Sequence, residues 1–166
     1  MNKYDVIIIG AGPSGIFCAY EFMRQKPDMK VLMIEKGRSI EKRQCPKRTT
    51  KVCVGCKPCS ITTGFAGAGA FSDGKLSLSP DVGGTLPEIL GYEKAEELIK
   101  EADNIYLKFG ADEKVYGIDD YEAIERIRAK AIRANLKLIE CPIRHLGTEE
   151  GYKIYTRLQE HLLASG

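Results

Sequence analysis

The stretch IIIGAGPSG, residues 7–15, places three glycines directly after a run of isoleucine. Residues 6–9 form a continuous apolar run, which is typical of a strand buried on both faces of a parallel sheet. Pro13 falls where the first turn of a helix tolerates proline, because that N–H would have no helical partner. Apolar residues at helical spacing follow, and the helix is expected to end near Lys26. The stretch therefore predicts a strand, a glycine turn and a helix.

The glycine turn has the spacing of a dinucleotide-binding motif. Residues 31–34 predict a second strand that ends at Glu35, and Gly10–Gly15 read G-x-G-x-x-G between the first strand and the helix. Gly10 permits the tight turn, Gly12 lets the main chain approach a pyrophosphate, and Gly15 lets the helix pack closely on the strand. The N–H groups at the start of the helix would then face the phosphates. The alternative is a glycine turn that only packs tightly.

Glu35 is the acid expected at the end of the second strand. Its carboxylate can accept hydrogen bonds from both hydroxyls of an adenosine ribose, and it would repel a 2′-phosphate, which counts against NADP at this site. The turn does not distinguish FAD from NAD, because both contain ADP.

A second glycine-rich stretch, TTGFAGAGAFSDGKLSLS, covers residues 62–79 and carries no charge before Asp73. Such a stretch can bring bare main-chain N–H groups against a flat ring such as the isoalloxazine of a flavin, and Lys75 can supply positive charge near N1 and O2. The alternative is a flexible Gly/Ala loop. The hydrophobic residues that flank the glycines favour an ordered segment.

Four cysteines cluster between the two glycine segments. Cys45 precedes the run Cys53-x-x-Cys56-x-x-Cys59, in which thiols recur at two-residue gaps. Tetrahedral thiolate ligation suits zinc or an iron–sulfur cluster. Redox-active thiols and unligated structural thiols are the alternatives. Residues 38–57 also contain seven Lys or Arg and one acid, which indicates either a solvated loop or a loop that faces the phosphates of a cofactor.

The composition and the N-terminus bound the class of protein. The chain has 166 residues, a net charge of +2 and 43% hydrophobic residues, which is the composition of an ordinary soluble protein. We therefore expect neither a nucleic-acid partner nor a membrane partner. The N-terminal apolar run is too short for a signal peptide. We therefore expect a cytoplasmic protein whose cysteines form no disulfide framework.

The second half returns to regular structure. An apolar stripe from Ala95 to Phe109 predicts a helix, Asp119 predicts the capped start of another, and Asn135 its left-handed end. Residues 136–140 predict a strand stopped by Pro142, and a last helix follows. The fold class is thus α/β with a Rossmann-like FAD/NAD(P)-binding fold. We expect residues 1–80 to form an FAD-binding βαβ unit with a flavin-contacting loop, and residues 81–166 to be a helical α/β segment of the same, incomplete domain.

These motifs together resemble a known family. The runs IIIGAGPSG, VLMIEKG, RQCP and CKPCSITTGFAGAGAFSDGKLSLSPDVGG, with IYLKFGADEKVYG after them, resemble bacterial FAD-dependent dehydrogenases of the NAD(FAD)-utilising group, which have the glutathione-reductase-type FAD fold. Family members are much longer, and this chain corresponds to their N-terminal portion. The resemblance implies FAD as cofactor, held by Gly10, Gly12, Pro13, Ser14, Gly15, Glu35, Lys36, Arg43, Gly67, Ala68, Gly69, Ala70, Ser72, Gly74 and Lys75.

The function expected from this resemblance is that of an oxidoreductase, a dehydrogenase that passes hydride or electrons through a flavin. Its substrate is a small redox-active molecule, NAD(P)H is a candidate co-substrate, and no catalytic side chain is assigned because the flavin itself reacts. One alternative is a module that binds FAD or ADP without turnover. Another is an NAD-binding protein similar to thiazole synthases, which use a similar GAGPSG turn; residues 62–79 count against it. The sequence does not determine the oligomeric state.

Overall fold

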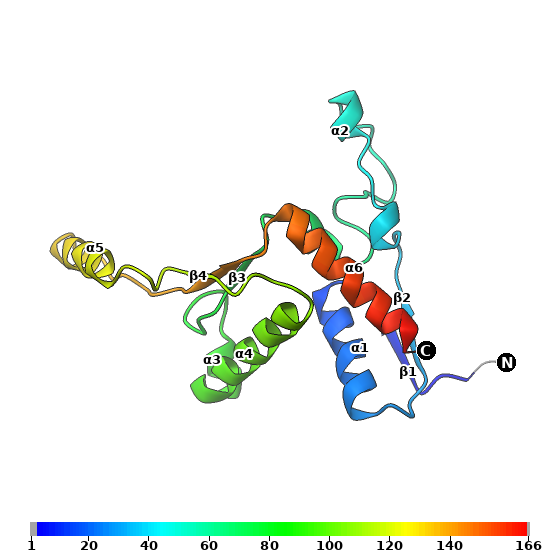
Figure 1. Ribbon diagram of the computed structural model, residues 1–166, viewed down its shortest axis with the longest axis horizontal. Helices are drawn as coiled ribbons and strands as arrows, with labels where there is room; N and C mark the ends of the chain where they lie inside the picture. The colour runs from blue at the N-terminus through cyan, green and yellow to red at the C-terminus, as the bar shows by residue number, and fades with distance from the viewer. Residues whose placement is uncertain (1–2, 166) are drawn as a thin grey trace. The chain divides into compact units, whose positions relative to one another are not determined.

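The computed structural model describes residues 3–165, and the chain divides into two compact units. The first unit joins residues 1–74 to 148–166, and the second comprises residues 75–147. Figure 1 shows the elements of both units in chain order. The sequence-based division of one FAD domain into residues 1–80 and residues 81–166 stays a prediction. Within the described residues, no helix combines the length and the apolar character that crossing a membrane requires.

The first unit begins as the sequence predicts. Strand β1 (Val6–Ile9) pairs in parallel with β2 (Val31–Ile34), and helix α1 (Pro13–Gln25) connects them. Pro13 occupies the first turn of α1, where its missing N–H costs no hydrogen bond. The chain is therefore mixed α/β and starts with a βαβ arrangement.

The prediction that β1 is buried on both faces is wrong. Ile7 is 58% exposed and Ile9 is 86% exposed. In the described part of the chain, the sheet of β1 contains only β2 as a second strand, and α1 contacts both strands. Alternate side chains of β1 therefore remain open to solvent, because no other element of the unit covers them.

The core of the first unit forms where the C-terminal helix returns to the N-terminal segments. Helix α6 (Thr148–Ala164) packs against α1 and two short 3₁₀ helices, η1 (Ile40–Lys42) and η2 (Gly67–Phe71). The large side chains with no exposed surface come from α1, η1 and α6: Ile16, Ile40, Ile154 and Leu158. Burying each contributes on the order of 1.5–3 kcal/mol to folding. Helix α6 thus holds in place the segment that carries the second glycine stretch.

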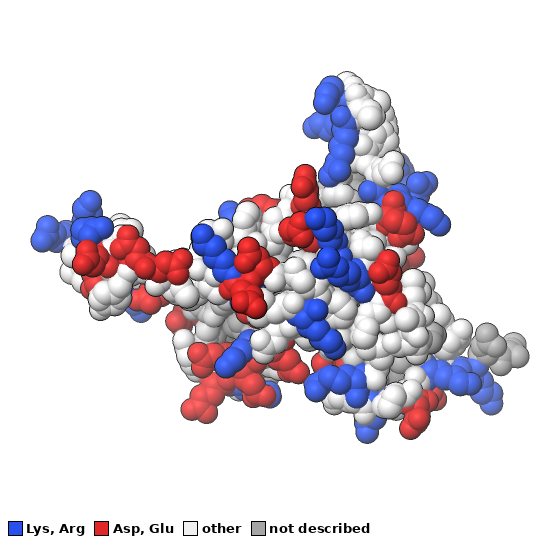
Figure 2. Space-filling model, in the orientation of Figure 1, with Lys and Arg blue, Asp and Glu red and all other residues white. Residues whose placement is uncertain are grey.

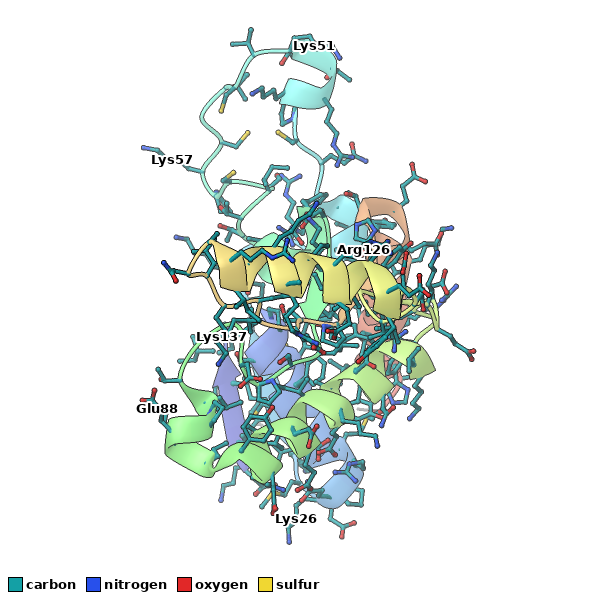
Figure 3. All side chains as sticks on the ribbon, turned by 90° about the vertical axis from the view of Figure 1, so that its left-hand side faces the viewer. Lys26, Lys51, Lys57, Glu88, Arg126 and Lys137 are labelled. Carbon is teal, nitrogen blue, oxygen red and sulfur yellow. The ribbon has the colours of Figure 1, made fainter. Side chains whose placement is uncertain are left out.

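Between η1 and η2 the chain makes a long loop that contains the short helix α2 (Lys47–Thr50). Figure 2 shows Lys and Arg side chains gathered along this segment, and Figure 3 shows the sulfur atoms of the loop near the labelled Lys57. This loop is the basic, cysteine-rich region recognised in the sequence.

The second unit is built around a small antiparallel sheet in the order β3 (Lys75–Ser77), β5 (Ile143–His145), β4 (Val115–Tyr116). Its helices are α3 (Leu86–Leu90), α4 (Tyr92–Lys108) and α5 (Tyr121–Arg133). Arg144 in β5 binds both carboxylate oxygens of Asp103 in α4, at 2.5 and 2.7 Å. This nearly buried ion pair joins the sheet to α4.

Two local predictions for the second unit need correction. Residues 136–140 form no strand. The strand begins at Ile143, after Pro142, because Ile143 and Arg144 pair with both β3 and β4, and His145 pairs with β3. The cap of α5 is Asp120 rather than Asp119, since the Asp120 side chain accepts the hydrogen bond from Ala123 N at 2.8 Å. The predicted left-handed end at Asn135 is confirmed by its φ of 56°.

Candidate functional site

The first glycine segment forms a turn with free space beside it. Gly10 has a φ of 101°, and Gly12 is the residue that caps α1. A Cβ added at either position would meet no heavy atom within 4 Å, whereas a Cβ at Gly15 would lie 2.0 Å from the carbonyl oxygen of Gly10. Gly15 is therefore needed for the close packing of helix and turn predicted from the sequence. Gly10 and Gly12 leave the main chain accessible.

The second glycine segment lies directly against the first. The backbone N–H of Ala66 donates to the carbonyl oxygen of Ala11 at 2.7 Å. Gly67, at a φ of 58°, sits so close that an added Cβ would lie 3.5 Å from the Cα of Gly12. Two stretches separated by about fifty residues of sequence thus meet at the start of α1, and both present main chain with little side chain.

The Glu35 carboxylate ties the turn to the loop after β2. It accepts hydrogen bonds from the backbone N–H groups of Ala11 and Gly37, each at 2.8 Å. Partial burial opposes ionisation of Glu35, but these two N–H groups and that of Gly64 outweigh it and hold its pKa below the ordinary value. A charged carboxylate therefore stands at the end of β2, beside the glycine turn.

Arg43 organises the main chain of the second glycine segment. Its guanidinium donates to four carbonyl oxygens, at distances between 2.5 and 3.0 Å: those of Ser60, Ile61, Phe65 and Gly67. The side chain is only 3% exposed, and its burial lowers its pKa, an effect that the charge of Glu35 partly offsets. Arg43 was predicted to contact the cofactor; here its donors bind the loop that lies against the turn.

The other predicted cofactor residues fall into three groups. Ser14, Pro13 and Ala68 are exposed near the meeting point of the two glycine segments, while Ala70 is buried. Ser72 and Gly74 follow η2, where the Ser72 hydroxyl donates to the carbonyl oxygen of Gly69 and accepts from the N–H of Gly74. Lys36 lines a cleft in the loop that follows β2, and Lys75 begins β3 in the second unit.

A close crossing of two glycines behind this site was not predicted from the sequence. Gly37 and Gly64 approach so closely that a Cβ on Gly37 would lie 2.4 Å from the backbone N of Gly64. The neighbouring Arg38 forms a parallel bridge with Gly64, and its carbonyl accepts from Phe65 N at 2.9 Å. The available signal was a glycine two residues after the acid that ends the second strand, because a close approach of two backbones needs a glycine.

Helix α6 supports the second segment from behind. The hydroxyl of Tyr155 lies 3.4 Å from the place where a Cβ on Gly69 would sit. Gln159 accepts from the backbone N–H of Ile40 at 2.9 Å and donates to the Glu41 carboxylate at 3.0 Å. The sequence predicted this helix, but it did not predict that the Gln159 side chain would bind η1.

The cysteines do not converge on one point. All six are free thiols, and the part of the chain from residue 3 to 165 contains no group of three or more His, Cys, Asp or Glu side chains placed to hold a metal ion. The metal site predicted at Cys45, Cys53, Cys56 and Cys59 therefore stays a prediction from the sequence alone. Cys56 and Cys59 line one cleft. Hydrogen bonds from the N–H groups of Ile61 and Thr62 lower the pKa of the Cys59 thiol.

The N-terminal part of the chain is similar to known proteins. Residues 1–41 match the model of the Thi4 family. A thiamine thiazole synthase of Coprinopsis cinerea is 48% identical over 33 residues, which is 20% of this chain and 10% of that protein. The chain thus aligns with about a tenth of the length of this curated relative. No solved structure matches.

The matched region contains β1, α1, β2 and Glu35. Its residues fit the ADP part of a dinucleotide: free space beside Gly10 and Gly12, a helix start without a side-chain cap, and a charged acid after β2. The second glycine segment, residues 62–79, lies outside the match.

Proposed function

We propose that this chain binds the ADP part of FAD at the glycine turn and forms the nucleotide-binding part of an FAD-dependent oxidoreductase. The observation that carries the proposal is the hydrogen bond from Ala66 N to Ala11 O, because it brings the second glycine segment onto the first. A turn that bound ADP alone would not need this second stretch of bare main chain. FAD, when bound, supplies the electron-accepting ring; the protein positions it.

The chain's own residues have distinct roles in this proposal. The first N–H groups of α1, which have no partner within the helix, face the pyrophosphate. Glu35 receives the ribose hydroxyls, which its lone pairs permit while it remains bonded to Ala11 and Gly37. The segment from Gly67 to Ser72 presents main chain with little side chain to the remainder of FAD, and Arg43 fixes that segment from behind.

An NAD-binding protein similar to thiazole synthases is the second candidate. It is favoured by the family match over residues 1–41 and by the relative from Coprinopsis cinerea. Both candidates share the ADP site, so they differ in what the second glycine segment does. In the first candidate the second glycine segment contacts the flavin ring of FAD. In the second candidate the ligand is NAD, and this segment contacts no flavin.

Binding measurements separate the candidates. We expect the purified chain to bind FAD and ADP in fluorescence or calorimetric titrations, and FAD at least tenfold more tightly than NAD, because the ring adds contacts. Tighter binding of NAD than of FAD would favour the second candidate. Absence of binding to FAD, ADP and NAD alike would contradict both.

Gly12→Val tests the location. The new side chain would occupy the open space beside the turn, so we expect a large loss of affinity for ADP. The variant should still fold, because no protein atom lies within 4 Å of a Cβ at Gly12. Gly151→Ala in α6 is the control, since its Cβ also meets no atom within 4 Å and the residue lies outside both glycine segments. Equal affinity of Gly12→Val and the native chain for ADP would place the nucleotide elsewhere.

A separate measurement distinguishes turnover from passive binding. Bleaching of the absorbance of bound FAD by NADH or NADPH would show that the chain reduces its flavin.

A further inference from the structure

The loop between η1 and η2 carries two thiols that the proposed function does not use. Cys56 and Cys59 both line a cleft of about 450 Å³, together with Lys36, Lys57, Pro58 and Thr63. Neither Cys45 nor Cys53 is among its lining residues, although both belong to the same loop. From a cluster of four cysteines, the structure thus selects one pair.

The two members of the pair have different surroundings. Cys59 is exposed, and its sulfur accepts hydrogen bonds from the backbone N–H groups of Ile61 and Thr62 and from the Thr62 hydroxyl, with the positive charge of Arg43 nearby. These groups stabilise a thiolate, the form of cysteine that attacks sulfur. Cys56 is half-buried and precedes Cys59 by three residues, the spacing of a Cys-x-x-Cys pair. Cys59 is therefore suited to attack a disulfide bond, and Cys56 is suited to break the mixed disulfide that this attack forms.

The cleft is basic. Lys36 and Lys57 line it, and an adjoining cleft of about 200 Å³, which shares Cys56 and Lys57, adds Arg38. No acidic side chain lines either cleft within the described residues. A molecule that enters to reach the two thiols therefore meets only positive charge, which favours a negatively charged partner.

We propose that Cys56 and Cys59 form a redox-active dithiol that reduces small anionic disulfides bound in this basic cleft. Neither thiol belongs to the glycine segments, so the inference does not depend on the proposed function, although the cleft shares Lys36 with the predicted cofactor residues and Thr63 with the second glycine segment.

The reaction is two successive thiol–disulfide exchanges. The Cys59 thiolate attacks one sulfur of the disulfide R–S–S–R; a Cys59–S–S–R bond forms, the original S–S bond breaks, and one RS⁻ leaves. The Cys56 thiolate then attacks Cys59 Sγ, forms the Cys56–Cys59 disulfide and releases the second RS⁻. The two cysteine thiols lose two electrons and two protons in total, and the small disulfide gains them as two thiols.

The test uses the full chain, fully reduced, with oxidised glutathione as the anionic probe under anaerobic conditions. After alkylation of free thiols, peptide mass spectrometry locates every disulfide. We expect one intramolecular bond, between Cys56 and Cys59, and two glutathione molecules released per chain. A bond that involves Cys45 or Cys53 instead, or glutathione spread evenly over the cysteines, would overturn the proposal.

Single variants assign the two roles. Cys56→Ser should accumulate a stable glutathione adduct on Cys59, because the resolving thiol is missing. Cys59→Ser should slow the reaction at least tenfold and leave Cys56 largely unmodified. Cys53→Ser is the matched control, since Cys53 is exposed in the same loop but lines neither cleft, and its rate should equal that of the native chain. A slowing by Cys53→Ser as large as that of Cys59→Ser would contradict the assignment.

The charge of the cleft has its own readout. Oxidised glutathione should react about tenfold faster than the cationic disulfide cystamine at low salt, and Lys57→Gln should reduce that ratio. Circular dichroism confirms that each variant folds. Equal rates for the two probes would exclude an anion-selective cleft. Iron or zinc bound stoichiometrically to the native chain, with all four clustered thiols protected from alkylation, would overturn the dithiol in favour of a metal centre.

Discussion

The carboxylate of Glu35 accepts a hydrogen bond from the backbone N–H of Ala11 at 2.8 Å, although 24 residues separate them. The bond joins the end of β2 to the glycine turn between Gly10 and Gly12. A second bond from Gly37 N holds the other carboxylate oxygen at 2.8 Å. The acid proposed to receive the ribose thus also links the end of β2 to the turn that follows β1.

Glu35→Gln separates these two roles of the acid. An amide has one acceptor oxygen, so one of the N–H groups of Ala11 and Gly37 loses its partner, and we expect a loss of about 1–3 kcal/mol in unfolding free energy. If Glu35 also binds ribose, affinity for ADP should fall further than affinity for pyrophosphate. Urea denaturation and titrations with both ligands measure this. Equal losses for the two ligands would restrict Glu35 to a structural role.

Gly15→Ala tests the packing of α1 on the turn. The added Cβ would lie 2.0 Å from the carbonyl oxygen of Gly10, so helix and strand must separate. We expect a loss of about 1–3 kcal/mol or more in the free energy of unfolding. Gly151→Ala in α6, where the Cβ meets nothing, should instead gain about 0.5–1 kcal/mol. Similar stability for both variants in urea would show that the close approach at Gly15 does not constrain the fold.

The glycine turn was predictable because its chemistry is local: strand, turn and helix follow from neighbouring residues, and the role of Gly15 follows from spacing. The exposure of Ile9 was not, because burial of a strand depends on how many other strands join its sheet. Asp120 replaced Asp119 as the helix cap because two adjacent acids offer the same signal. The role of Arg43 was hidden for a different reason: its partners are main-chain carbonyls, which every residue has.

Arg43→Lys tests whether the guanidinium holds the second glycine segment. A lysine ammonium cannot satisfy four carbonyl oxygens in the fixed arrangement that the planar fork reaches. We expect a loss on the order of 2–3 kcal/mol in unfolding free energy, together with faster proteolysis near Phe65. Lys47→Arg in the exposed helix α2 is a control that should change neither quantity. Unchanged proteolysis in Arg43→Lys would show that the segment orders itself without this clamp.

Asp103→Asn tests the ion pair that joins β5 to α4. Arg144 is 5% exposed at its side chain and Asp103 is 12% exposed, so removal of the negative charge leaves a nearly buried guanidinium uncompensated. A loss of about 3–5 kcal/mol in the second unit is expected, since breaking one partner of a buried pair is costly. Glu122→Gln, in an exposed pair with Arg126, should have a much smaller effect in the same denaturation experiment. Comparable losses would mean that Arg144 finds other compensation, such as the carbonyl oxygen of Asp112.

Acid should weaken the contact between η1 and α6 through Glu41. Hydrogen bonds from Ser39 and then from Gln159 lower the pKa of Glu41 from 4.5 to about 2. Because the folded-state pKa is depressed, the stabilisation is complete above pH 4.5 and is lost as the pH falls from about 4.5 to about 2.

The stability difference between the native chain and Glu41→Gln should therefore shrink over that interval, as urea denaturation from neutral pH into the acid range would show. Ser39→Ala, which removes the larger cause of the shift, should flatten the native dependence in the same direction. A difference that stays constant with pH would mean that the Glu41 carboxylate titrates alike in the folded and unfolded chain, and that Gln159 binds η1 through Ile40 alone.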